Sequence, residues 1–69
     1  MSKFSSSLAK NIKKIRKIKE ISQDKLSKLA GITFHTITKI ESGATLDPRV
    51  VTVKKIADAL EISIDELLK

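Results

Sequence analysis

Apolar residues recur at intervals of three or four positions along most of this chain. That spacing lines one face of an α-helix, and no segment sustains the period-two alternation of a strand. The pattern therefore predicts five helices and no strands, at about 5–20, 23–30, 34–42, 49–60 and 64–68. The side chains expected to face a core are Leu8, Ile12, Ile15, Ile18, Leu26, Leu29, Ala30, Ile37, Ile40, Val50, Val53, Ile56, Ala57, Leu60, Ile64, Leu67 and Leu68.

The ends of these helices carry residues that suit them. Serine and threonine side chains can accept a hydrogen bond from the free N–H groups at the start of a helix. The expected N-caps are the serines at 5–7, Ser22, Thr33 and Ser63, the last in a capping box with Glu66. Phe4 is expected to pack against the first turn of the first helix. Gly31 and Gly43 fit the left-handed backbone that ends many helices.

Residues 23–42 form the most informative segment, because two short amphipathic helices are broken there at Gly31. The second of these helices would bury Ile37 and Ile40 on one side. Its opposite side would present Phe34, His35, Thr38 and Lys39 to solvent. This arrangement is typical of a helix-turn-helix, which lays its second helix in the major groove of DNA.

Positive charge is concentrated at the start of the chain. The net charge is +6, and residues 1–19 carry seven Lys or Arg and no acid, whereas the remainder sums to −1. This asymmetry suggests a polyanionic partner, although a lysine-rich face that only keeps the protein soluble would give the same count.

Length and composition limit the remaining possibilities. The 69 residues predict a single domain, with residues 1–6 expected as a tail. With no Cys and one His, the chain predicts no metal site, cofactor or small-molecule ligand, and a cytoplasmic location. No apolar run approaches the roughly 18 residues of a membrane span, and no secretory signal is expected.

Several short motifs then occur in order along the chain. They are Ile15-Arg16, Ile21-Ser22-Gln23, Leu26, Leu29-Ala30-Gly31-Ile32, Ile37, Ile40-Glu41-Ser42-Gly43, Ile56-Ala57-Asp58-Ala59-Leu60 and Ile62-Ser63. In these motifs the chain resembles the Cro/cI-type helix-turn-helix family, the phage-repressor-like or XRE domains, over about residues 8–68. The resemblance implies an all-α, compact five-helix, lambda-repressor-like DNA-binding domain with its helix-turn-helix at helices two and three. It also implies that the domain binds double-stranded DNA as a homodimer and regulates transcription.

The resemblance assigns a structural role to one charged pair and exposes three departures. Arg16 and Glu41 match a family pair that forms a buried ion pair between helices one and three. Glu20 and Glu61 stand where the family usually has Gly, at turns that often need a left-handed residue. Ser27 replaces a small apolar residue of helix two and is small enough for the same packing.

DNA-contacting residues follow from the exposed side of the third helix and from the family pattern. The candidates for base contact are Phe34, His35, Thr38 and Lys39, with Lys39 suited to guanine and Phe34 to a thymine methyl group. The candidates for phosphate contact are Gln23, Thr33, Thr36, Gly43, Arg49, Lys10 and Asn11. Phe34 could instead be partly buried packing, and Gln23 and Thr33 could serve only at helix starts.

A dimer would use the apolar C-terminal end of the chain. The interface is expected to contain Leu60, Ile62, Ile64, Leu67 and Leu68, unless these side chains simply complete the core of the monomer. Two such domains would place their recognition helices one DNA turn apart on a near-palindromic site.

The sequence thus predicts a repressor that binds a near-palindromic operator as a dimer. An antitoxin or a restriction–modification controller would use the same domain, and a protein-interaction module could share its fold. The basic helix at 10–19 could lie on an anionic membrane, but its apolar face coincides with the core positions of the family. An enzyme is not expected, because there is one His, no Cys and no glycine-rich phosphate loop.

Overall fold

The computed structural model describes residues 3–44 and 48–69, with side chains described from Ser7 onward, and all regular structure in those ranges is helical. The helices are α1 (Lys3–Ile18), α2 (Gln23–Ala30), α3 (Phe34–Ser42), α4 (Val50–Ala59) and α5 (Ile64–Leu68). The prediction of a five-helix, all-α domain is therefore confirmed. Helix α1 begins at Lys3, so it starts before the serines expected to cap it, and residues 3–6 are helical and not a tail. The expected contact of the Phe4 side chain lies outside the described residues.

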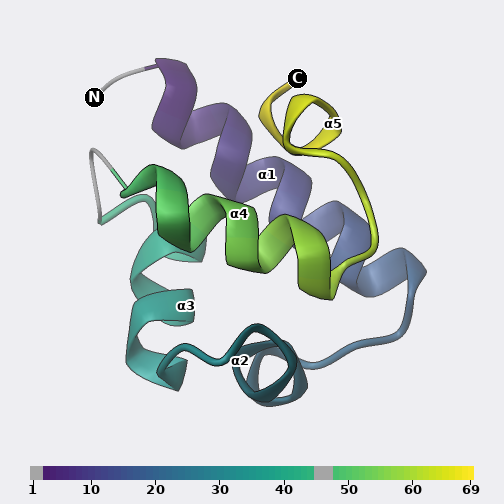
Figure 1. The fold of residues 1–69 in the computed structure, drawn as a ribbon. Coiled ribbons are helices and arrows are strands. Elements are labelled where there is room, and N and C mark those ends of the chain that lie inside the picture. The colour runs from purple at the N-terminus through teal and green to yellow at the C-terminus, as the bar shows by residue number, and fades with distance from the viewer. Residues whose placement is uncertain (1–2, 45–47) are drawn as a thin grey trace.

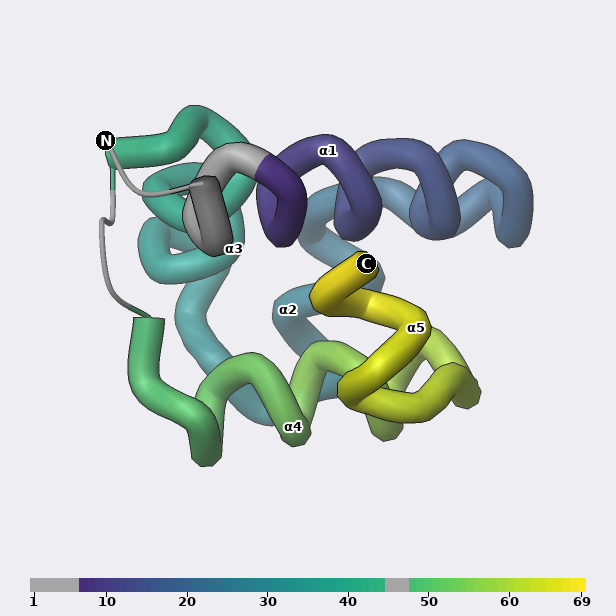
Figure 2. The backbone as a smooth tube through the Cα atoms, turned by 90° about the horizontal axis from the view of Figure 1, so that it is seen from above, coloured from purple at the N-terminus to yellow at the C-terminus, as the bar shows by residue number. Residues whose placement is uncertain are grey.

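The helices pack around a single centre, with α1 and α4 as its two longest walls (Figure 1). Helix α1 packs against α3 and α5, while α4 packs against α2 and α5. Seen from above, α5 lies between α1 and α4, and α3 lies at the opposite end from the turn that joins α4 to α5 (Figure 2). The short helices α2 and α3 are also in contact with each other, so the helix-turn-helix is one wall of the domain.

The core is aliphatic and receives side chains from every helix. Its large, fully buried members are Leu8, Ile12, Leu26, Ile37, Ile56, Leu60 and Leu67. Burying such a side chain stabilises the folded state by about 1.5–3 kcal/mol relative to leaving it in water. The periodicity of the sequence therefore located most of the core correctly.

Three residues predicted to face the core are exposed, and for these the prediction was wrong. Ile18 is 69% exposed, Leu29 52% and Val50 75%. All three occupy the first or last turn of their helices. Periodicity shows which face of a helix a residue occupies, but at a helix end no neighbouring helix need cover that face.

Three of the helix starts are capped as the sequence predicts. The side chains of Ser22, Thr33 and Ser63 accept hydrogen bonds from the backbone N–H groups of Lys25, Thr36 and Glu66, respectively. Helix α4 differs, because its N-cap residue Arg49 makes no side-chain capping bond.

Helices α1 to α4 all end in the same backbone motif, whose C′ residues are Glu20, Gly31, Gly43 and Glu61. In each case the N–H of the C′ residue bonds three residues back and the next N–H bonds five residues back, as in a Schellman motif. The C′ residue is left-handed each time, with φ of 56° at Glu20, 69° at Gly31, 80° at Gly43 and 59° at Glu61. The expectation of left-handed backbone at the two glutamates is confirmed.

Candidate nucleic-acid interface

The turn between α2 and α3 sets the direction of α3. Gly31 takes the left-handed backbone that reverses the chain, and Ile32 behind it packs against the core. The inner side of α3 is then held by Ile37 and Ile40, which are 1% and 3% exposed. With that side buried, the opposite side of the helix must face solvent.

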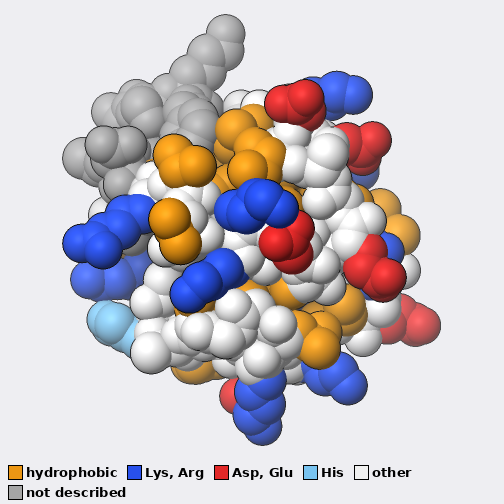
Figure 3. Space-filling view, viewed as in Figure 1, with side chains coloured by type: hydrophobic (Ala, Val, Ile, Leu, Met, Phe, Trp, Pro, Cys, Tyr) orange, Lys and Arg blue, Asp and Glu red, His pale blue; other side chains and the backbone are white. Residues whose placement is uncertain are grey.

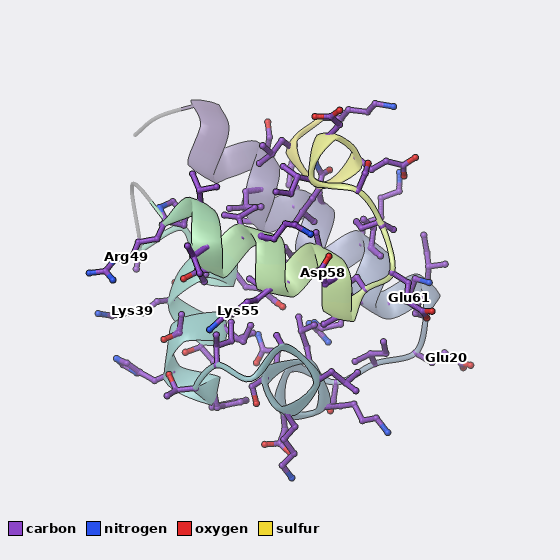
Figure 4. The ribbon with its side chains drawn as sticks, viewed as in Figure 1. Glu20, Lys39, Arg49, Lys55, Asp58 and Glu61 are labelled. Carbon is purple, nitrogen blue, oxygen red and sulfur yellow. The ribbon has the colours of Figure 1, made fainter. Side chains whose placement is uncertain are left out.

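The four residues predicted to contact bases share this outward side of α3. Phe34 is 49% exposed, so its ring is only partly used in packing. His35 and Lys39 are exposed and Thr38 is half-buried. The Lys39 side chain extends away from the body of the molecule (Figure 4). The structure therefore brings together a ring, an imidazole, a hydroxyl and an ammonium group on one short helix.

A charged network behind this surface fixes the position of α3. The Arg16 guanidinium donates from Nε to Glu41 Oε2 at 2.8 Å and from Nη2 to Glu41 Oε1 at 3.0 Å. Its Nη1 donates to the Ile21 carbonyl at 2.9 Å. The Glu41 side chain is only 2% exposed and that of Arg16 is 14% exposed. Arg16 and Glu41, expected to pair, are therefore in bidentate contact, a geometry that holds two helices in one orientation.

Gln23 belongs to the same network. Its Nε2 donates to Glu41 Oε1 at 3.0 Å, across the interface between the start of α2 and the end of α3. The expected phosphate role of Gln23 must therefore share this amide with a structural one. Glu41 accepts hydrogen bonds from both Arg16 and Gln23, so one carboxylate joins α1, α2 and α3.

The two threonines at the start of α3 are bonded to each other. Thr33 Oγ1 accepts from the Thr36 N–H at 3.1 Å and lies 2.8 Å from Thr36 Oγ1. Both remain at the outward N-terminal edge of α3, where Thr33 is exposed and Thr36 is half-buried. The capping role of Thr33 is thus observed, and any phosphate contact of either threonine would add to these bonds.

Two of the residues expected to contact phosphates use a hydrogen-bond donor within the protein. Asn11 Nδ2 donates to the Leu67 carbonyl at 2.7 Å, so this half-buried side chain ties α1 to α5. The N–H groups of Gly43 and Ala44 donate to Ile40 and Lys39 carbonyls at 3.1 Å and 3.0 Å, so the end of α3 uses them. The sequence offered no signal for the Asn11 or Gln23 contacts, because their partners lie 56 and 18 residues away.

Two of the residues expected to contact phosphates are exposed cations. Arg49 is exposed and extends in the same direction as Lys39 from the start of α4 (Figure 4). Lys10 is exposed on α1. In Figure 3, Lys and Arg side chains lie beside the histidine, and others are spread over the rest of this face. Most of the visible Asp and Glu side chains lie toward the other side. The charge of this surface suits a polyanion.

The apolar end of the chain contributes more to the core than expected. Leu60 and Leu67 are 0% exposed, so they offer no side-chain surface to a second subunit and must be removed from the expected dimer interface. Ile62, Ile64 and Leu68 are half-buried and pack against the same core. Only these three of the expected residues retain accessible surface.

The turn at Gly31, the buried side of α3 and its exposed polar side together define a helix-turn-helix protein. A family model described as "Helix-turn-helix" matches residues 12–67. The chain belongs to this family, the XRE or Cro/cI-type helix-turn-helix proteins, which are DNA-binding regulators. A comparison with curated proteins finds no match. Within the described residues, no helix has both the length and the apolar character needed to cross a bilayer.

Proposed function

We propose that this protein is a sequence-specific transcriptional repressor that binds duplex DNA through α3. The observation that carries the proposal is the outward side of α3, where Phe34, His35 and Lys39 are exposed beside the half-buried Thr38. This helix is fixed from behind by the Arg16–Glu41 pair. A recognition helix needs this combination, because its base contacts depend on a fixed orientation in the groove. The bound protein would then keep RNA polymerase from the promoter by occupying the DNA.

Base and phosphate contacts divide between two sets of residues. His35 and Lys39 carry exposed polar groups suited to base edges, with Lys39 matched to the O6 and N7 acceptors of guanine. Arg49 and Lys10 are exposed cations that would neutralise phosphates. Thr33 and Gln23 would add contacts from the starts of α3 and α2. These roles remain proposals that affinity measurements on single variants can separate.

A single domain would read too few base pairs for an operator. Helix α3 has nine residues, a length of about 13.5 Å, which matches about four base pairs of DNA. A two-fold dimer would double this reading and place two α3 helices one DNA turn apart. Ile62, Ile64 and Leu68 are the residues we assign to the dimer contact, because they are the apolar side chains at the C-terminal end that keep accessible surface.

The experiment that tests the proposal is selection from randomised duplexes. The purified chain is incubated with the pool, and the retained DNA is sequenced. We expect a near-palindrome whose half-sites lie about 10 base pairs apart. Retention without any enriched sequence would contradict sequence-specific binding.

The alternative of a protein-interaction module gives a different salt response. DNA binding should weaken steeply as salt rises, because bound phosphates release their counterions. No affinity for any duplex at low salt would favour the protein-interaction module. An antitoxin or restriction–modification controller would give the same enriched near-palindrome as a repressor, and the genes beside the site would identify it.

A further inference from the structure

The outward side of α3 contains an apolar strip formed by Phe34 and Thr38. The two residues are four positions apart, so they are neighbours on one side of the helix, with Cβ atoms roughly 5–6 Å apart. Phe34 is one of two aromatic residues in the chain and is 49% exposed. If α3 lies in the major groove as proposed, an apolar group of the DNA beside this ring would remove apolar surface from water and so add to the affinity.

Hydrogen bonding within α3 adds to this apolar character. Thr38 Oγ1 donates to the His35 carbonyl at 2.8 Å, so the hydroxyl hydrogen is already used inside the helix. Ser42 is engaged in the same way with the Lys39 carbonyl at 3.0 Å. The Thr38 hydroxyl is therefore not a donor to a base in this conformation. The methyl group on the same carbon is what remains for an apolar contact.

We propose that the Phe34–Thr38 strip binds the 5-methyl groups of pyrimidines in the half-site, those of thymine or of 5-methylcytosine. This inference rests on the proposed function, because it assumes that α3 lies in the major groove. The thymine methyl is the apolar group that a base pair presents there. The two residues lie about 6 Å apart along the helix axis, and successive nucleotides of a strand are about 3.4 Å apart. The strip therefore spans methyl groups within about two nucleotides of each other.

The first test removes methyl groups from the DNA. In the duplex enriched by selection, each thymine is replaced in turn by uracil, which changes nothing but the methyl group. Affinity is measured by fluorescence anisotropy. We expect about a fourfold loss at one or two positions of each half-site, the effect of one buried methyl. At the same positions, a cytosine–guanine pair should bind about fourfold tighter when the cytosine carries a 5-methyl group.

The second test changes Thr38 in two matched ways. Thr38→Ser keeps the hydroxyl and removes the methyl, whereas Thr38→Val keeps a methyl and removes the hydroxyl. We expect Thr38→Ser to lose about fourfold on the thymine duplex and to become insensitive to uracil at one position. Thr38→Val should retain the affinity and the uracil response. Loss of affinity in Thr38→Val with no loss in Thr38→Ser would overturn the proposal, because the hydroxyl would then be the reader.

Phe34→Ala should abolish the uracil response at its own position, and Lys39→Ala should leave every uracil response intact. Circular dichroism of the helical signal checks that each variant folds. If Phe34→Ala does not fold, the two variants at Thr38, Thr38→Ser and Thr38→Val, decide the question. A specific duplex that is insensitive to uracil at every position overturns this inference alone. If no duplex is bound specifically, both this inference and the proposed function fail.

Discussion

Single residues at the helix ends determine how much strain the fold contains. Gly31 and Glu20 occupy the same C′ position and have φ of 69° and 56°, yet only glycine adopts this backbone without a side-chain penalty. For another L-residue the left-handed conformation is unfavourable by roughly 1–2 kcal/mol. Glu20 and Glu61 are held in this conformation because the isoleucines that follow them, Ile21 and Ile62, pack against the core. That packing offsets the unfavourable backbone conformation.

Glycine at either position should therefore stabilise the protein. We expect Glu20→Gly and Glu61→Gly each to raise the free energy of unfolding by about 1 kcal/mol, a Tm increase of about 4–8 °C in a domain of this size. Thermal melts followed by circular dichroism measure this. Glu20→Ala and Glu61→Ala are the controls, because they remove the charge but keep a Cβ, and they should not raise the Tm. Equal increases in the alanine and glycine variants would show that charge and not backbone strain is responsible.

At the scale of the elements, polar contacts orient helices that could not hold their positions alone. Helices α2 and α3 have eight and nine residues, below the about 12–15 needed for marginal stability in isolation. Glu41 joins α3 to Arg16 of α1 and to Gln23 of α2. The direction of the exposed side of α3 therefore depends on one buried carboxylate as well as on the core beneath it.

Removing one member of the Arg16–Glu41 pair should be far worse than removing both. Arg16→Met or Glu41→Leu leaves a buried charge without its partner, and each should cost about 3–5 kcal/mol of folding stability. The double variant should lose clearly less than either single one, as measured by chemical denaturation. The exposed Lys54–Asp58 pair is the control, and Lys54→Met should be nearly neutral. Single variants as stable as the wild type would show that the ion pair does not hold the helices.

At the scale of the whole molecule, acidic side chains are scarce on the side that carries α3. The chain carries a net charge of +6. Lys39 and Arg49 extend on the α3 side (Figure 4), while most visible acidic side chains lie away from it (Figure 3). Such a field attracts a polyanion and orients it toward the basic side. At the α5 end, Asn11 donates to the Leu67 carbonyl and so joins α1 to α5. The DNA-binding surface that we propose lies on the α3 side.

Two substitutions on this side should have different effects on binding. Arg49→Ala should weaken all duplexes alike and reduce the slope of affinity against salt by about one unit. Lys39→Ala should instead lose discrimination at one base pair, by about 1–3 kcal/mol. Titrations of matched and mismatched duplexes at several salt concentrations distinguish the two results. Lys69→Ala, on the last residue after α5, should change neither, and a uniform loss in Lys39→Ala would make that residue a phosphate contact.

Most of the fold could be predicted from the chain because its signals are local. Helical periodicity located α2 and α3, and Ser22, Thr33 and Gly31 marked their ends correctly. The failures occurred where a second element decides the outcome. Ile18 and Val50 continue the apolar period, but no helix covers them. The hydrogen bond of Asn11 was not foreseen, because α5 supplies its partner from 56 residues away.

The candidate site divides in the same way. By itself the sequence determined which side of α3 is apolar and therefore which residues can face DNA, because periodicity is a property of one helix. Only the tertiary structure decided that Glu41 also holds Gln23, that Leu60 and Leu67 are sealed in the core, and that the N–H of Gly43 is used by its own helix. Burial and hydrogen bonding depend on distances between segments, and those distances exist only once the helices have packed.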